Sequence, residues 1–129
     1  MAAAASRRIV ERFLADVLNG EHPASAQVLV ADEMLRRRVA SFRTAFPDLR
    51  VTTRRVVAQD ALVAVHLIGS GTQRGAFLGC PPSGRTWEAT CSAVYRVADG
   101  RIAEAWVNWD LLAILEQLGC VERVATASA

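Results

Sequence analysis

The apolar positions near the start of the chain recur at helical spacing. Between Ser6 and Gly20 they stand three or four residues apart, which predicts one helix with a buried face. Ser6 is the expected N-cap, because its hydroxyl can accept a hydrogen bond from a free backbone N–H. Asn19-Gly20 is the expected end, since glycine readily adopts the left-handed conformation of a C-cap.

Two further helices are expected before the pattern changes. Pro23 suits the first turn of a short helix that reaches about Val30. Asp32 is the expected N-cap of a third helix, whose apolar positions run to Phe46. Pro47-Asp48 ends that helix.

After this point the period shortens to the two-residue alternation of strands. We expect strands at residues 50–58, 62–75, 87–98 and 101–109. Gln59-Asp60 is the first turn between them, and Asp99-Gly100 is a strong signal for a two-residue hairpin. Asp110 is expected to cap a last helix over 111–118, with Gly119 as its C-cap.

The order of these elements predicts the fold class. Helices, then an antiparallel meander, then a short helix indicate an α+β protein. A sheet curved over the helices forms a cone, and an apolar cone is a pocket for a small or medium hydrophobic molecule. A length of 129 residues fits one domain. We therefore expect a single domain over residues 1–129, with a core of about 6–120 and a frayed C-terminal tail.

Glycine and proline positions in the second half of the chain carry a more specific signal. The segment GTQRGAFLGCPPSGR at 71–85 is followed by ADGRIAEAW and then by WDLLAILEQLG, and FRTAFPDL precedes all three. In this order the chain resembles the SnoaL-like polyketide cyclases of the nuclear transport factor 2-like superfamily. The resemblance covers roughly 9–119, and it implies a cone-shaped sheet on N-terminal helices and a cyclase or isomerase of secondary-metabolite biosynthesis.

Alternation along the third and fourth expected strands identifies the pocket face. Alternate residues of a strand share a face. The apolar face of the third strand is Trp87, Ala89, Cys91, Ala93 and Tyr95, and one face of the fourth is Ala103, Ala105, Val107 and Trp109.

The resemblance places three polar groups of the family on this face. The general acid/base aspartate of the family falls on Val107, an assisting histidine on Ala93 and a ligand-binding glutamine on Cys91. All three polar groups are replaced here. The three positions lie on the same faces of their strands as the apolar residues above, which supports this face as the pocket wall. The substitutions argue against the family's aldol ring closure, which needs a positioned carboxylate to transfer a proton.

Two residues are the candidate catalytic groups that remain. Asp110 is the nearest surviving carboxylate to the absent base, although its role as a helix N-cap accounts for it fully and a helix N-terminus lowers a carboxyl pKa. Tyr95 is a candidate hydrogen-bond donor to a substrate carbonyl, or an amphipathic core residue. Trp87 and Trp109 are candidate flat walls for an aromatic ligand, or core residues.

The second expected strand adds two candidate substrate-binding residues, His66 and Gln73. Gln73 stands where many relatives of the family have histidine, and an amide makes hydrogen bonds to a ligand or to backbone rather than moving protons. The two have opposite parity, so both face the pocket only if a bulge at Gly69 or Gly71 intervenes.

Two functions of different classes follow from these residues. The first is a cyclase-type enzyme that holds a bulky, mainly apolar polyketide-like substrate in a reactive conformation without the usual Asp/His pair. The alternative is a non-catalytic member of the superfamily that binds a hydrophobic ligand or a protein.

The charge pattern does not favour nucleic-acid binding. The formal net charge is only +2. Arg36, Arg37 and Arg38 point about 100° apart on a helix, so they do not form one flat phosphate-binding face. We expect no nucleic-acid partner.

The remaining composition restricts location and cofactors. No apolar run is long enough to cross a bilayer, and the N-terminal MAAAASRR lacks the apolar segment of a secretory signal, so we expect a cytoplasmic protein with no membrane partner. Cys80, Cys91 and Cys120 are an odd number at wide spacing, which predicts neither a disulfide framework nor a metal site. We expect no metal and no cofactor.

The second face of the fourth strand predicts self-association. Ile102 and Trp106, with Val94 of the third strand, would leave apolar area on the convex side of the sheet. We expect a homo-oligomer, most simply a homodimer.

Overall fold

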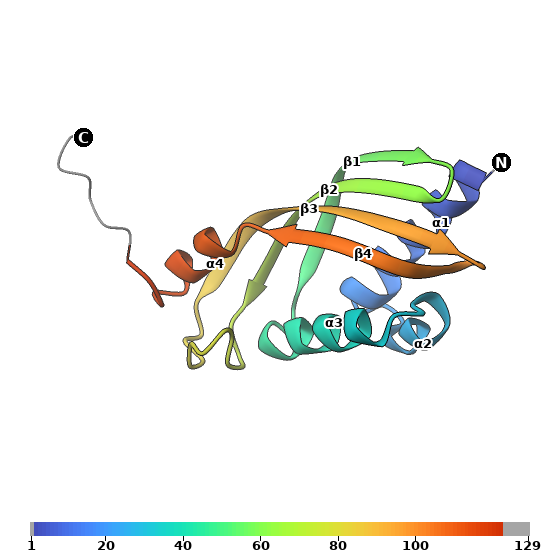
Figure 1. Ribbon diagram of the computed structural model, residues 1–129. Coiled ribbons are helices and arrows are strands. Elements are labelled where there is room, and N and C mark those ends of the chain that lie inside the picture. The colour runs from blue at the N-terminus through green and yellow to red at the C-terminus, as the bar shows by residue number, and fades with distance from the viewer. Residues whose placement is uncertain (1, 123–129) are drawn as a thin grey trace, which may run out of the picture.

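A curved antiparallel sheet covers three helices in this computed structural model, which describes residues 2–122. The strands are β1 (Arg50–Gln59), β2 (Leu62–Thr72), β3 (Thr86–Ala98) and β4 (Arg101–Trp109), paired in the order β1-β2-β3-β4. Figure 1 shows the helices α1, α2 and α3 beneath the sheet and α4 beyond the end of β4. The α+β class and the cone-like arrangement are as predicted.

The first helix begins earlier than its expected cap. α1 spans Ala2–Phe13 and continues into a π-helical turn, Leu14–Leu18. Ser6 is not the N-cap, because the preceding alanines favour helix strongly and extend it past this position. The Ser6 hydroxyl instead donates to the Asp60 carbonyl at 2.9 Å, which fixes the helix to the β1–β2 turn.

The other helix ends follow the sequence closely. The short helical region begins with a 3-10 turn, Pro23–Ser25, and continues as α2, Ala26–Leu29. α3 spans Glu33–Ala45, and the Asp32 carboxylate accepts from the Met34 amide at 3.0 Å. α4 spans Leu111–Gln117 and ends before Gly119, whose φ is +74°.

The β2 strand ends three residues before its expected boundary. The backbone amides of Arg74 and Gly75 donate to the Ala45 carbonyl at 2.9 and 3.2 Å, so the chain leaves the sheet to bond with the end of α3. A Cβ on Gly75 would lie 2.9 Å from the Thr44 carbonyl oxygen, and only glycine allows this approach.

The register between β2 and β3 is continuous from Leu62 to Thr72, so no bulge occurs at Gly69 or Gly71. Gly69 has a different role: a Cβ there would lie 2.5 Å from the Trp109 ring, which therefore needs the glycine to pack against the sheet. The irregularities fall elsewhere, between Thr53 and Arg55 of β1 and between Arg96 and Val97 of β3.

A disulfide corrects the prediction made from cysteine spacing. Cys80, in the turn after β2, is bonded to Cys120 after α4, with their Cα atoms 5.9 Å apart. The pair is 40 residues apart in sequence, so only the fold brings the two together. Cys91 is a free thiol and is buried. The expected frayed tail falls on 123–129, outside the described residues.

No helix between residues 2 and 122 is long and apolar enough to cross a membrane.

Candidate functional site

A cavity of about 740 Å³ lies between the concave face of the sheet and α3. Its inner part is apolar, and polar side chains are gathered along α3. The lining residues on the sheet and the first helices include Phe13, Leu18, Leu67, Cys91, Tyr95, Ala105, Val107 and Trp109.

The predicted pocket face contributes five residues to this lining. Cys91 and Tyr95 of β3, with Ala105, Val107 and Trp109 of β4, all border the cavity. Ala93 shares their face and is buried at 3% exposure, but it packs in the core and does not line the cavity.

One wall of the cavity is aromatic. The Trp109 ring stacks on Phe42 of α3, with 5.1 Å between centroids and 19° between planes. Trp87 lies behind this pair, edge-on to Trp109 at 5.6 Å and 2% exposed, and it does not line the cavity. Trp109 therefore borders the cavity, whereas Trp87 supports it from the core.

Tyr95 brings a hydroxyl to the buried part of the cavity wall. Tyr95 is 2% exposed, and its hydroxyl has no hydrogen-bond partner within the described part of the chain. Trp87 Nε1 is the one fully enclosed side-chain polar atom of residues 2–122 that lacks a partner. The Tyr95 hydroxyl is therefore not fully enclosed, and Tyr95 is one of the residues that line the cavity.

Burial keeps both titratable side chains of the inner wall protonated. Desolvation raises the pKa of Tyr95 above its usual range, and the neighbouring Cys91 adds to the rise. Desolvation also raises the pKa of the Cys91 thiol to about 12, against a smaller opposite effect of a backbone hydrogen bond from Asn108. A thiol in this state is a poor nucleophile, since the thiolate is the reactive form.

Asp110 lies at the edge of the site rather than within it. Its carboxylate accepts from the Ala113 amide at 3.1 Å and so caps α4, and the residue is exposed and absent from the cavity lining. The neighbouring Leu111 does line the cavity.

Gln73 supports a loop. It is fully buried, and its amide nitrogen donates to the carbonyls of Gly75 and Cys80, each at 3.1 Å. Its amide oxygen accepts from the Ser83 amide and hydroxyl at 3.2 and 2.6 Å. These bonds hold the 73–85 loop, whose residues Ala76, Phe77 and Leu78 line the cavity.

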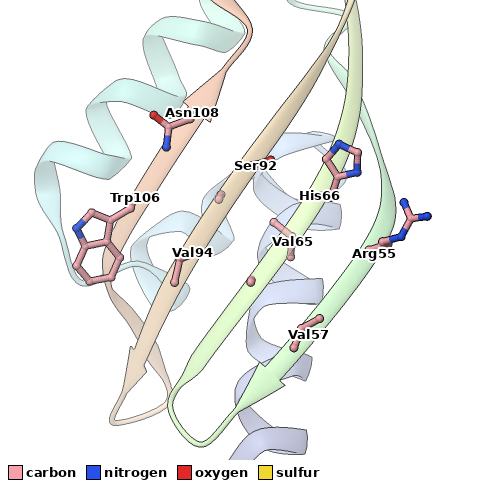
Figure 2. A pocket seen from close by; sticks show the side chains of 10 residues that line it. Arg55, Val57, Val65, His66, Ser92, Val94, Trp106 and Asn108 are labelled. Atoms are coloured by element: carbon pink, nitrogen blue, oxygen red, sulfur yellow. The ribbon is translucent and has the colours of Figure 1, made fainter.

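His66 lies on the opposite side of the sheet from the cavity. Figure 2 shows it in a shallow outer groove of about 310 Å³ with Arg55, Ser92 and Trp106. Trp106 is 50% exposed there. Ile102, which was expected to add to this apolar face, is fully buried, because the start of β4 pairs through a bridge with Val30, the residue after α2.

Sequence reasoning missed the helical side of the cavity. α3 contributes lining residues along most of its length, and these are Met34, Leu35, Arg37, Arg38, Val39, Ser41 and Phe42. The apolar spacing of Leu35, Val39 and Phe42 was visible in the sequence. The polar residues beside that stripe were the signal for the cavity mouth. No group of three or more metal-ligating side chains occurs among residues 2–122.

The comparisons with known proteins agree with this arrangement. The family model described as SnoaL-like polyketide cyclase matches residues 3–118. The chain belongs to the SnoaL-like polyketide cyclase family. No curated protein matches it.

Several solved structures of similar proteins share the fold. TsrD from Streptomyces laurentii is 24% identical, with 94% of this chain and 99% of TsrD covered and a TM-score of 0.80. A SnoaL-like protein from Jannaschia sp. CCS1 is 21% identical, with 94% and 96% covered and a TM-score of 0.83. IdmH from Streptomyces antibioticus is 27% identical, with 88% and 98% covered and a TM-score of 0.73. All three match this chain over nearly their whole length.

Proposed function

We propose that this SnoaL-like protein is a cyclase or isomerase of small-molecule biosynthesis that acts on a bulky, mainly apolar polyketide-like ketone. The observation that carries the proposal is the cavity of about 740 Å³ with one unpartnered hydroxyl, that of Tyr95, in its inner wall. A volume of this size suits a polycyclic or folded linear ketone.

Tyr95 is the candidate catalytic group. Its hydroxyl stays protonated and has no protein partner, so it is available to donate to a substrate carbonyl. Such a bond strengthens as negative charge develops on the oxygen during enolisation or ring closure. The Phe42–Trp109 stack would hold a flat part of the substrate beside it.

The rest of the rate enhancement is assigned to orientation. Holding two reacting parts of one chain in contact can supply several kcal/mol, about 7–11 in favourable systems, without an acid–base pair. Asp110 is kept as the second candidate because it is the carboxylate next to the lining residue Leu111, although its present role is to cap α4.

A turnover assay tests the proposal. Purified protein is offered uncyclised ketone products of a polyketide synthase, and ring formation is compared with the spontaneous rate by mass spectrometry. Ala105→Phe fills the cavity from β4, and Thr90→Phe on the exposed outer face of β3 is the matched control. We expect Ala105→Phe to abolish binding and turnover and Thr90→Phe to retain both.

Asp110→Asn separates the two mechanisms. Asparagine also caps helices, so the fold is kept while the charge is removed. We expect most of the activity to remain. A loss of more than about a hundredfold in the chemical step, with binding intact, would make Asp110 the acid/base group instead.

The alternative is a non-catalytic member that binds a hydrophobic ligand or a protein. It is favoured by the absence of the carboxylate, histidine and glutamine that the family resemblance places on Val107, Ala93 and Cys91. Tight binding of the ketone with no acceleration of ring formation would decide for it.

We also propose that the protein is a homodimer that pairs through the outer face of the sheet. Trp106 and Val57 are 50% and 67% exposed there and lie in one groove with Val94 (Figure 2). Exposed apolar area of this kind is typical of an interface between copies.

A further inference from the structure

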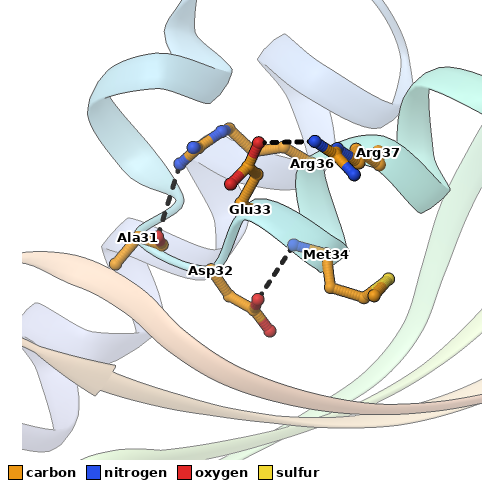
Figure 3. A network of polar contacts seen from close by, with 6 residues as sticks. All are labelled: Ala31, Asp32, Glu33, Met34, Arg36 and Arg37. Carbon is orange, nitrogen blue, oxygen red and sulfur yellow. Dashed lines mark hydrogen bonds and ion pairs between the residues drawn. The ribbon is translucent and has the colours of Figure 1, made fainter.

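Three consecutive arginines at the start of α3 have three different surroundings. Arg36 donates to the Val30 carbonyl at 2.6 Å and to the Ala31 carbonyl at 3.4 Å. Arg37 forms an ion pair with Glu33 at 2.9 Å. Figure 3 shows the Arg36–Ala31 and Arg37–Glu33 contacts. Arg38 makes no hydrogen bond or ion pair within the described residues.

The unpaired arginine belongs to the cavity. Arg38 lines it together with Leu35, Val39 and Phe42 of the same helix. These residues stand three and four apart, so Arg38 projects from the side of the helix that borders the apolar stripe. Because the residue is itself exposed, its guanidinium is at the mouth and not in the interior.

The rest of the mouth offers Arg38 little to bind. The exposed rim is largely apolar, since Met34, Leu78, Val107 and Leu111 are 55%, 64%, 39% and 42% exposed and all line the cavity. An arginine surrounded by apolar side chains and open space lacks the polar partner that its five donors can bind.

The one acidic residue of the lining is already engaged elsewhere. The Asp32 carboxylate caps α3 by accepting from the Met34 amide at 3.0 Å. Asp32 precedes Arg38 by six residues, about 9 Å along a helix axis at 1.5 Å per residue, which is near the distance over which salt screens exposed charges. Glu33 is paired with Arg37. Neither carboxylate neutralises Arg38.

We propose that the cavity selects ligands with a carboxylate on an otherwise apolar body, and that Arg38 binds this carboxylate at the mouth. The apolar body lies against Phe42 and Trp109, and a ligand carbonyl reaches the Tyr95 hydroxyl deeper in the cavity. Arginine presents a planar pair of N–H donors that matches the two oxygens of a carboxylate. The inference rests on the proposed function and specifies the substrate class of the same site.

A matched pair of ligands tests the inference. Anthraquinone-2-carboxylate and its methyl ester share one flat, apolar diketone body and differ in a single charge. Binding of each is measured by quenching of tryptophan fluorescence, corrected for ligand absorbance, since Trp109 lines the cavity. We expect the wild-type protein to bind the acid about tenfold more tightly than the ester at low salt, and the preference to fall as NaCl is added.

Two variants locate the source of the preference. Arg38→Gln should weaken binding of the acid about tenfold and leave the ester within about twofold. Arg36→Gln removes the same charge from a nearby residue, which does not line the cavity and whose guanidinium donates to the Val30 and Ala31 carbonyls, and it should change neither affinity by more than about twofold.

Three other binding results would contradict the inference. Equal affinities for acid and ester in the wild-type protein would overturn the role of Arg38 while leaving the cavity as the ligand site. Equal losses in Arg36→Gln and Arg38→Gln would show a diffuse effect of charge and would also overturn it. If neither ligand binds, the proposed function fails together with this inference.

Discussion

Tyr95 packs edge-on against Phe13, with 5.5 Å between ring centroids and 61° between ring planes. Tyr95 lies on β3 and Phe13 is the last residue of α1, so the contact joins the sheet to the helical layer. It holds the tyrosine ring in the inner wall of the cavity. The hydroxyl at the end of that ring has no protein partner. A hydroxyl on a ring that is held in place, and that has no partner in the protein, is available to donate a hydrogen bond to a ligand atom.

Tyr95→Phe should separate ligand binding from folding. Because the hydroxyl makes no hydrogen bond in the protein, its removal should change the free energy of unfolding by less than about 1 kcal/mol. The affinity for a polycyclic ketone should fall about fivefold or more, because the ligand carbonyl loses its donor. Thermal unfolding and fluorescence titration of the same samples measure the two effects. A large loss of stability with unchanged affinity would show that the hydroxyl has a structural role instead.

The disulfide should stabilise the protein. Cys80–Cys120 joins the loop after β2 to the end of α4 across 40 residues, and closing a loop of this length stabilises a fold by roughly 2–4 kcal/mol. Cys120→Ser should lower the free energy of unfolding by this amount, as measured in urea. Dithiothreitol should have the same effect on the wild-type protein and none on the variant. If reduction leaves the midpoint of the wild type unchanged, the bond does not form in solution.

Stability should fall in acid through Asp48. Partial burial acts to raise the pKa of this carboxyl, but the Thr72 amide and hydroxyl, each donating at 2.7 Å, outweigh it and hold the pKa below 3.8. A lowered pKa in the folded state stabilises the protein above the unfolded value, and this contribution is lost as the pH falls through the folded value.

Asp48→Asn isolates this effect, since asparagine cannot titrate. Denaturant unfolding between pH 6 and pH 2 should show a weaker loss of stability below about pH 4 in the variant than in the wild type. Asp32→Asn is the control, since it removes a carboxylate that caps α3 rather than bonding to β2, and asparagine also caps helices. Parallel curves for Asp48→Asn and the wild type would contradict the assignment.

The outer groove should mediate self-association. Trp106→Arg places a charge in the centre of the apolar area and should shift the protein from dimer to monomer, because like charges would face each other across a two-fold axis. Light scattering at micromolar concentration measures the mass of both proteins. Glu104→Arg, on the same strand, is a less suitable change because it also breaks the ion pair with Arg96. A monomeric wild-type protein would remove the proposal.

Most of the helices, strands and turns could be predicted from the sequence, because caps and hairpin turns depend on residues that are neighbours in the chain. The caps at Asp32 and Asp110 form as expected, and Asp99-Gly100 makes a hairpin with φ of +52° and +72°. The failures have a common cause. Ser6 and Cys80 find their partners in Asp60 and Cys120, more than 35 residues away, and sequence spacing does not show such contacts.

The site was predicted only on its sheet side, for the same reason. Strand alternation identifies which residues of β3 and β4 face inward, but it does not say how deeply the helices fill the concave face. Cys91, Tyr95, Val107 and Trp109 therefore reach the cavity while Ala93, with the same parity, is covered. Gln73 bonds with backbone of its own loop because the chain leaves the sheet before it.

The central claim is that the cavity beneath the sheet binds a polycyclic ketone through Tyr95. A crystal structure of the protein with anthraquinone-2-carboxylate tests it most directly. We expect the ring system beside Trp109 and Phe42, with a quinone oxygen about 2.8 Å from the Tyr95 hydroxyl, the usual length of an O–H···O hydrogen bond. A ligand bound only in the outer groove, or a cavity filled by protein side chains, would contradict the account.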